Sequence, residues 1–503
     1  MPLKKNIIAN YIGQGWVALM QLAFIPLYIK YLGMEAYGLI GVYAVLQAVF
    51  LLMDMGMAPT LNREMASFTA GKHTSQSIRE LLFSIEVISI GIALLIIMVM
   101  LVTSSWLAMH WLQADQLPID TVKKTIAIMG IVAALRVIES IYRGAIIGLQ
   151  TQVWLNKASA FLATARWFGV VGVLSWISPS ILAFFWWQAF ISFVTVIIFA
   201  LRVHQVLPTA SRAVRFSKPA ILGISDFAKG MIATTALSLI LTQTDKILLS
   251  RLLSLEAFGA YTLAATVANG LMLLVSPLTQ SYYPRFTELL VRHNDHGLIA
   301  AYHQASQLMV VMVVPVTLIL IFHGEAVLYL WTGNNKLAHN SSQLVALLAL
   351  GTAFLGLMNI PYMLQLAHGW SIFAAKVNAI IIVVMIPVLL WATPRYGAIG
   401  AACVWVAITS SYIFIVIPIM HRRLIPKEKW RWYWQDNILP TCAASCVVLA
   451  GLWVHPILSS NIGQLAWLTT VGLFSFGSAL FAAPILRNKL LKLIWYKFQV
   501  NQV

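Results

Sequence analysis

Long apolar stretches recur along nearly the whole chain, and each is close to the length that crosses a lipid bilayer. A transmembrane α-helix needs about 20 mostly apolar residues. The pattern predicts an all-α polytopic membrane protein with about 14 transmembrane helices, near residues 7–30, 38–60, 82–108, 125–149, 156–177, 181–202, 222–250, 258–280, 300–324, 342–366, 375–393, 398–420, 437–457 and 464–485. Because this number is even, both termini are expected on the same side of the membrane.

The stretch at residues 125–150 carries three charges in an otherwise apolar sequence. Arg136, Glu139 and Arg143 are spaced by three and four residues, which places them on one helical face. The next stretch contributes Arg166, at a similar depth if the two helices are antiparallel neighbours. Charges in hydrocarbon are costly and usually face a protein interior or a wet cavity. Two interpretations follow: a structural ion pair through Glu139, or a cationic cavity for an anionic substrate.

The composition and the charge distribution agree with a membrane protein. Of the 503 residues, 60% are hydrophobic and 10% are charged, and the mean hydropathy is +0.84. A net charge of +17 would suggest nucleic-acid binding in a soluble protein, but basic loops on one side of a membrane explain most of it here. The segments predicted to lie inside contain 23 lysines and arginines, and those predicted to lie outside contain six. This bias predicts that both termini are cytoplasmic.

The sequence contains no signature of an enzyme or of a metal site. The connections between the apolar stretches are too short to form a catalytic domain, and neither a phosphate-binding loop nor an HExxH motif is present. The three cysteines lie in apolar stretches, where they are expected to pack as small apolar residues. The first stretch is too long for a cleavable signal peptide and is expected to remain as the first span.

A short internal repeat suggests how the helices are grouped. Residues 32–38 (LGMEAYG) and 253–259 (LSLEAFG) are similar, and six predicted helices separate them. Copies that enter the membrane in the same direction indicate parallel repeats. We therefore expect an N-lobe of helices 1–6 (residues 1–203), a C-lobe of helices 7–12 (204–424), and an appended pair, helices 13–14, with a cytoplasmic tail (425–503).

Polar residues in the first span indicate that it lines the interior. Asn10 and Gln14 require hydrogen-bond partners or water within the membrane. Pro26 removes a backbone hydrogen bond, and it is predicted to act as a hinge that opens one side of the cavity. Unchanged transport in a Pro26→Ala variant would show instead that the kink is only structural.

Three further charges have open interpretations. Asp54 lies deep in the second span, where it either pairs with an arginine or binds a coupling proton or cation. Asp226 and Lys229 are three residues apart, so they either pair with each other or contribute to the cavity. All three are candidate cavity residues.

Eight motifs, in this order and spacing, resemble the Wzx-type O-antigen flippases, which share a superfamily with MATE-type multidrug exporters and lipid II flippases. The resemblance runs from the first helix to about helix 12, and it includes no short catalytic signature. Phe258 replaces a tyrosine often found in that family. The motifs are YLGMEAYGLIGVY (31–43), LMDMG (52–56), YRGAIIGLQ (142–150), TQTDKILLSRLLSLEAFGAYTLA (242–264), YYPRF (282–286), LYLWTGN (328–334), LQLAHGW (364–370) and YGAIGAACVWV (396–406).

The resemblance implies a fold and a transport cycle. The fold is two six-helix lobes in a V-shaped, MATE-like arrangement around a cavity, with two C-terminal helices. The cargo is an undecaprenyl-diphosphate-linked oligosaccharide, moved by alternating access from the cytoplasmic to the periplasmic leaflet of the bacterial inner membrane. A coupling ion, H⁺ or Na⁺, is implied and no other cofactor. The implied partners are the lipid bilayer and, as open candidates, a polysaccharide polymerase and a chain-length regulator.

The cationic face fits such a cargo, because arginine binds phosphate oxygens with paired donors. The predicted substrate-binding residues are Arg136, Arg166, Arg143 and Lys229. One alternative is a MATE-like antiporter of multidrug or cationic substrates, which an acid-rich cavity would favour. The other is a membrane polysaccharide polymerase, which would require a larger polar segment.

Overall fold

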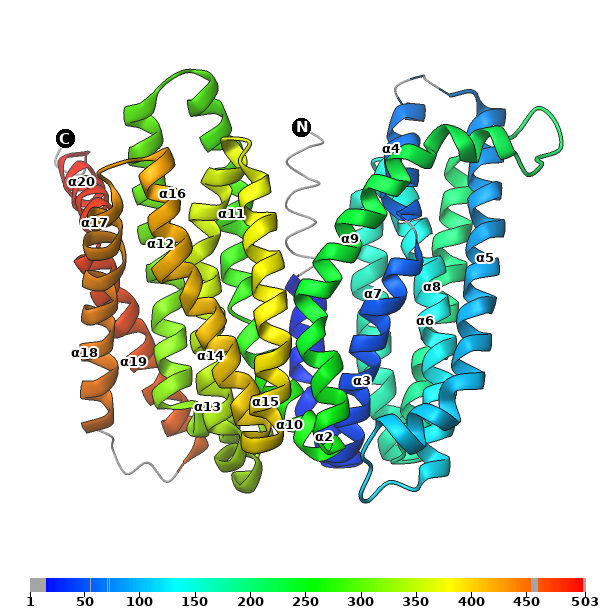
Figure 1. The fold of residues 1–503 in the computed structure, drawn as a ribbon, viewed down its shortest axis with the longest axis horizontal. Coiled ribbons are helices and arrows are strands. Elements are labelled where there is room, and N and C mark those ends of the chain that lie inside the picture. The colour runs from blue at the N-terminus through cyan, green and yellow to red at the C-terminus, as the bar shows by residue number, and fades with distance from the viewer. Residues whose placement is uncertain (1–14, 55, 70, 72, 454–459, 501–503) are drawn as a thin grey trace. The chain divides into compact units, whose positions relative to one another are not determined.

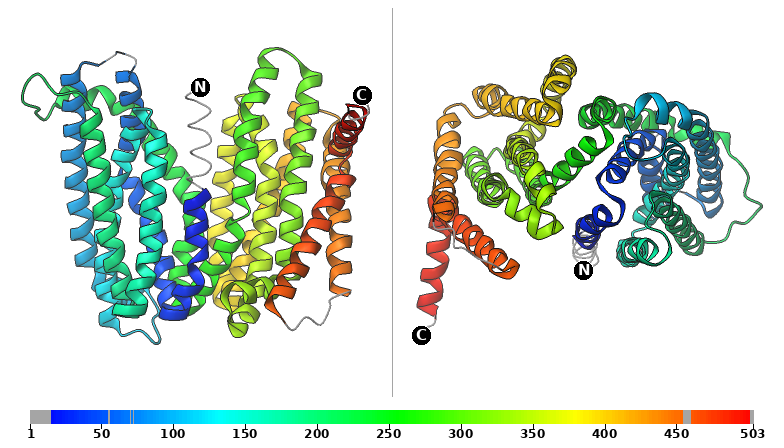
Figure 2. Two further views of the ribbon diagram at one scale, coloured as in Figure 1. Left: turned by 180° about the vertical axis from the view of Figure 1, so that it is seen from behind. Right: turned by 90° about the horizontal axis from the view of Figure 1, so that it is seen from below.

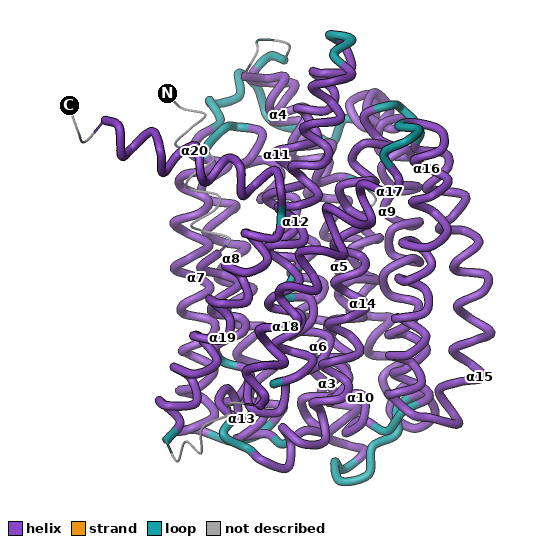
Figure 3. The backbone as a smooth tube through the Cα atoms, turned by 90° about the vertical axis from the view of Figure 1, so that its left-hand side faces the viewer, coloured by secondary structure: helices purple, strands orange, loops and turns teal. Residues whose placement is uncertain are grey.

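The computed structural model describes the chain apart from residues 1–14, 55, 70, 72, 454–459 and 501–503. The described residues form helices joined by loops and contain no β-strand, only an isolated bridge between Gln113 and Ser254 (Figures 1 and 3). Contacts along the chain divide it into two compact units, Met1–Gly259 and Ala260–Val503. The predicted all-α fold class is confirmed.

The first unit is built around helix α6 (Ile119–Gly148), against which α4, α5 and α8 pack (Figure 2). A helix covered on most sides must be apolar or small on most faces, and the buried residues of α6 are mainly valine, isoleucine, alanine and glycine. The other elements, in chain order, are α2 (Ile25–Leu32), α3 (Met34–Leu51), η1 (Leu52–Asp54), α4 (Met57–Thr69), α5 (Ser75–Trp106), η2 (Leu107–Trp111), α7 (Gln152–Gly172), η3 (Val173–Ile177), α8 (Ile181–Val206) and α9 (Lys218–Leu252). The next helix, α10 (Leu255–Asn269), begins in the first unit and continues in the second.

Two glycines allow α6 to approach α4 closely. A Cβ atom at Gly144 would lie 2.4 Å from the carbonyl oxygen of Ala58, and one at Gly148 would lie 2.3 Å from the carbonyl oxygen of Asn62. No side chain fits at such distances. Gly144 and Gly148 are four residues apart, and small residues at this spacing let membrane helices approach each other closely. This close contact fixes the rotation of α6 about its own axis against α4.

The two copies of the repeat contact each other reciprocally. A Cβ atom at Gly38 would lie 2.1 Å from the carbonyl oxygen of Leu255, and one at Gly259 would lie 2.6 Å from that of Met34. Met34 and Leu255 occupy the same position in the two copies, as do Gly38 and Gly259. Two related segments that face each other across an approximate two-fold axis would make such a pair of equivalent contacts.

The second unit is built around α12 and α14, which pack against each other and are mostly buried. Its longest helix, α15, has a non-helical residue at Gly397 (φ 59°, ψ −145°), in the predicted connection between helices 11 and 12. The elements are α11 (Met272–Val291), α12 (Asp295–Phe322), α13 (Gly324–Thr332), α14 (Asn335–Ala367), α15 (Ser371–Ser411), η4 (Tyr412–Val416), α16 (Ile417–Leu424), α17 (Lys429–Arg431), η5 (Trp432–Ile438), α18 (Leu439–Trp453), α19 (Asn461–Ala482) and α20 (Pro484–Val500).

Within the described residues, 12 helical segments are long and apolar enough to cross a membrane. One of them, Ile372–Leu424, covers the two predicted helices on either side of Gly397. The predicted seventh helix is present as α9, although it is not among the 12. The protein is therefore a multi-pass membrane protein, and the count of 14 spans stays a prediction.

The unit boundary differs from the predicted lobe boundary at residues 203 and 204. Helix α9 runs obliquely over the first unit and packs against α3, α4 and α5 (Figure 1). These contacts place the predicted seventh helix in the first compact unit, which ends at Gly259. The grouping into lobes of six helices stays a proposal.

Candidate functional site

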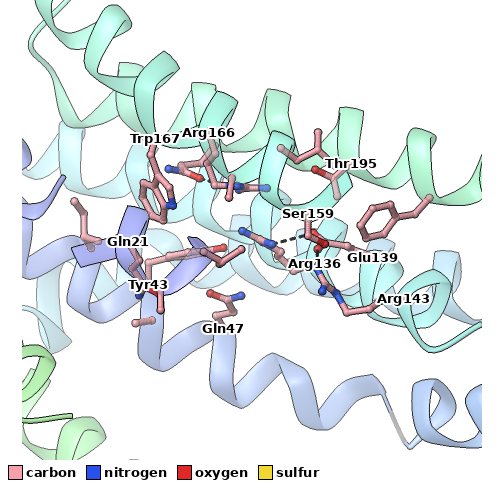
Figure 4. A pocket seen from close by; sticks show the side chains of 18 of the residues that line it. Gln21, Tyr43, Gln47, Arg136, Glu139, Arg143, Ser159, Arg166, Trp167 and Thr195 are labelled. Carbon is pink, nitrogen blue, oxygen red and sulfur yellow. Dashed lines mark hydrogen bonds and ion pairs between the residues drawn. The ribbon is translucent and has the colours of Figure 1, made fainter. Parts of the chain in front are cut away.

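The charged face of α6 lines a pocket inside the first unit. The pocket has a volume of about 460 Å³, and its walls come from residues 17–21 and from helices α3, α6, α7 and α8. Arg136, Arg143 and Glu139 lie together on one wall, and Arg166 enters from α7 (Figure 4). The structure thus brings Arg136 and Arg143 of the predicted fourth helix and Arg166 of the predicted fifth helix to one cavity.

Glu139 forms ion pairs with both arginines of its own helix. Arg136 Nη1 donates to Glu139 Oε2 at 2.9 Å, and Arg143 Nη2 donates to Glu139 Oε1 at 3.1 Å. The Glu139 side chain is 5% exposed, whereas those of Arg136 and Arg143 are 28% and 42% exposed. The predicted local pairing is therefore present, and the paired arginines still face the pocket.

Arg166 is held differently, by neutral groups. Its Nη1 atom donates to Gln188 Oε1 at 2.8 Å and to Ser192 Oγ at 3.2 Å, both on α8. The side chain is buried, and Trp187 Nε1 donates to the Arg166 backbone oxygen at 3.0 Å. Removing an arginine from water without a carboxylate partner is unfavourable. A position of this kind is consistent with an anionic ligand as the missing counter-charge.

The pocket carries an excess of positive charge. The described residues of its lining include three arginines and one glutamate, which gives a net charge of +2. The buried Nε atom of Arg136 makes no hydrogen bond of acceptable geometry with any described residue. A second hollow of about 370 Å³ shares Arg136, Glu139 and Arg143 with the first. The pocket therefore offers an excess of positive charge to an anion.

The other residues predicted for the cavity, for ion coupling or for substrate binding do not line the pocket in the described part of the chain. Asp54 is buried in η1, and its carboxylate accepts from the Ala58 backbone N–H at 3.2 Å, so it caps the start of α4. Asn10 and Gln14 lie outside the described residues, as do the side chains of Asp226 and Lys229. A role for any of them in the cavity or in ion coupling stays a prediction.

The first span is interrupted beside Pro26. Residues 15–23 are helical, Phe24 forms a turn, and α2 begins at Ile25 with Pro26 in its first turn. Proline is favoured at such a start because the missing N–H would have no helical partner there. The break is present at the predicted place, and its movement during transport stays a prediction.

Sequence reasoning missed a polar face of α8, from which Gln188 and Thr195 line the pocket and Ser192 bonds Arg166. Gln188, Ser192 and Thr195 are buried polar residues spaced by four and three in a strongly apolar helix. This spacing puts them on one face, which was a readable signal for a second polar wall. Only the packing of α7 on α8 shows that this face meets Arg166.

A family model described as Polysaccharide biosynthesis protein matches residues 3–290, more than half of the chain. The chain belongs to the polysaccharide biosynthesis protein family. A putative O-antigen transporter from Shigella flexneri is 21% identical over 429 residues, covering 80% of this chain and 94% of the relative. The predicted resemblance to the Wzx-type flippases is confirmed.

Solved structures show the same fold. The lipid II flippase MurJ in an inward closed conformation matches with a TM-score of 0.68 at 13% identity, over 97% of this chain and 99% of MurJ. An inward-facing multidrug resistance MATE family transporter of the MOP superfamily matches with a TM-score of 0.60 at 10% identity, over 82% and 96%. At 13% and 10% identity, these two structures show the fold of this member of the polysaccharide biosynthesis protein family.

Proposed function

We propose that this chain is a flippase that moves an undecaprenyl-diphosphate-linked oligosaccharide from the cytoplasmic to the periplasmic leaflet of the inner membrane by alternating access. The observation that carries the proposal is the pocket of net charge +2 among the apolar helices of the first unit. The Shigella flexneri relative is named as a putative O-antigen transporter, which supports a cargo of this class.

The chemistry of the pocket suits a diphosphate joined to sugars. Arginine presents planar paired donors to phosphate oxygens, and charge-assisted bonds of this type are the stronger ones. The amides of Gln21, Gln47 and Asn156 also line the pocket and can bond to sugar hydroxyls. The polyprenyl tail can stay in the bilayer while the head group crosses, because it is as apolar as the lipid.

The second candidate, a MATE-like antiporter of cationic compounds, rests on the shared fold. A pocket for cations would need an excess of carboxylates, whereas the only carboxylate among the described residues that line this one is Glu139, which two arginines already neutralise. The arrangement of charge therefore favours the anionic cargo.

Reconstitution in vesicles tests the proposal directly. Vesicles carrying the protein and a fluorescent polyprenyl-diphosphate oligosaccharide should exchange the labelled head group between leaflets much faster than protein-free vesicles. The expected control is a labelled cationic dye, which should not be transported. Transport of the dye without movement of the oligosaccharide would contradict the flippase and support the antiporter.

Topology is tested by reporter fusions. We propose that both termini face the cytoplasm, since 23 of the basic residues lie in predicted inner segments. A reporter active only in the periplasm should be active when fused after Lys336 and silent when fused after Lys429. The reverse pattern would overturn the assignment.

Coupling to H⁺ or Na⁺, and contacts with a polymerase or a chain-length regulator, belong to the same proposal.

A further inference from the structure

The second unit contains a buried charged group that the proposed transport function does not use. His303 on α12 lies between two carboxylates: its Nδ1 is 2.5 Å from Asp436 Oδ2, and its Nε2 is 2.8 Å from Glu428 Oε2. The side chains of His303 and Asp436 are 0% exposed, and that of Glu428 is 19% exposed. Glu428 precedes α17 and Asp436 lies in η5, so the group joins α12 to a segment more than 120 residues later.

The geometry requires one bound proton beyond those of a neutral histidine. Each of the two nitrogen–oxygen contacts needs a hydrogen between its atoms, because ionised carboxylates only accept. Neutral imidazole has a single N–H and would leave one nitrogen facing an oxygen with no hydrogen between them. Either His303 is an imidazolium or one carboxyl is protonated. In both cases the three groups carry a net charge of −1 rather than −2.

The hydrogen bonds of Gln307 determine that one carboxylate oxygen of Asp436 is an acceptor. The Gln307 Oε1 atom accepts from the backbone N–H groups of Ile485 and Leu486, at 2.9 and 3.4 Å, which leaves its amide group facing Asp436. Gln307 Nε2 then donates to Asp436 Oδ1 at 2.9 Å. That oxygen is therefore an acceptor, and the first turn of α20 is tied to the same group.

The neighbouring titratable groups do not supply the proton. His421 Nδ1 donates to the Ile417 carbonyl oxygen at 3.0 Å, and His421 Nε2 lies 3.1 Å from the Tyr302 hydroxyl, so both of its nitrogens are engaged outside the cluster. Arg431 lies 3.5 Å from Glu428 Oε2. The other charged or titratable groups of the neighbouring elements are Lys429, near His421, Tyr433, near Tyr302, and, from α20, Lys489, which bonds Gln304.

The segment that carries Asp436 has an unusual backbone. η5 is a π-helix of seven residues, Trp432–Ile438, and such turns are rare and frequent at functional sites. The Asn437 amide donates to the Trp432 carbonyl oxygen at 2.7 Å, and the buried Trp432 indole donates to Ser306 on α12 at 3.2 Å. The widened turn thus places Asp436 and Trp432 against α12.

We propose that His303, Asp436 and Glu428 form a proton-binding site that fastens η5 and the start of α20 to α12. With the proton bound, both contacts of His303 are satisfied. When the proton leaves, a nitrogen and a carboxylate oxygen face each other as acceptors. Glu428, the partly exposed member, then turns to solvent and the segment loosens. Proton exchange with water runs through Glu428, because the other two members are fully buried.

Hydrogen–deuterium exchange on the full-length protein in lipid nanodiscs tests this proposal. Protection of residues 429–438 and 484–490, corrected for the chemical exchange rate, is measured from about pH 5 to about pH 9, a range that titrates free histidine. In the wild type, protection should fall at least about tenfold as the pH rises, the effect of losing one charged hydrogen bond.

Glu428→Gln is the informative variant. Its amide can donate to His303 Nε2 while a neutral His303 donates to Asp436, so both contacts persist without the extra proton. Protection should then stay high at every pH. The matched control is His339→Gln, which removes the titratable ring from an exposed histidine–carboxylate contact of 3.1 Å with Glu325 and should leave the wild-type pH response intact.

Three results would overturn the proposal. The first is wild-type protection that does not change with pH, and the second is a Glu428→Gln variant that loses protection with pH as the wild type does. The third is a His339→Gln variant without the pH response, which would assign the response to the exposed pair.

Discussion

Arg166→Ala is expected to abolish transport while the protein remains in the membrane at normal abundance. Truncating one partner of a buried, hydrogen-bonded charge pair costs about 2–5 kcal/mol of binding free energy. This corresponds to a loss of affinity of roughly 30-fold or more. Arg166 is the buried arginine whose protein partners, Gln188 and Ser192, are both neutral. Its full charge is therefore available to a diphosphate, and its loss removes half of the net charge of the pocket.

Three companion variants separate charge from packing at this position. Arg166→Lys keeps the charge but lacks the planar paired donors, so it should lose most of the activity. Arg166→Met fills similar space without charge and should be inactive. Lys157→Ala removes an exposed charge from the same helix α7 and should transport normally. Surface polysaccharide is measured at matched membrane abundance. Normal polysaccharide in the Arg166→Met variant would show that this side chain only fills space between α7 and α8.

Arg136→Ala is expected to stop transport with little loss of stability, because Arg143 remains bonded to Glu139. Removing both arginines is different. Arg136→Ala/Arg143→Ala leaves a buried carboxylate without a partner, and breaking a buried ion pair in this way costs about 3–5 kcal/mol. The abundance and melting temperature of the double variant should therefore fall well below those of either single variant.

Adding Glu139→Gln to the double variant separates the structural from the binding role. The triple variant has no buried unpaired charge, so its abundance and melting temperature should recover. Transport should stay lost, because Arg166 is then the one charge left among the described residues that line the pocket. Recovered surface polysaccharide in the triple variant would contradict substrate binding by Arg136 and Arg143 and leave a structural ion-pair network.

The sequence by itself determined the features that depend on local periodicity. Apolar runs of membrane length predicted the helices, and the spacing of Arg136, Glu139 and Arg143 predicted their common face. Helix geometry repeats every 3.6 residues, so such neighbours follow from spacing alone. The family could also be predicted, because its motifs are spread along the chain in order.

Tertiary structure decided which distant groups meet. Glu139 had two arginines within reach on its own helix, and it bonds both. Arg166 found neutral partners on α8 rather than Glu139, because the packing of α7 on α8 sets that distance. His303 and Asp436 lie 133 residues apart in the sequence and meet only where η5 packs against α12. Contacts of this kind depend on helix rotation and on close approach at glycines, which a hydrophobic pattern does not encode.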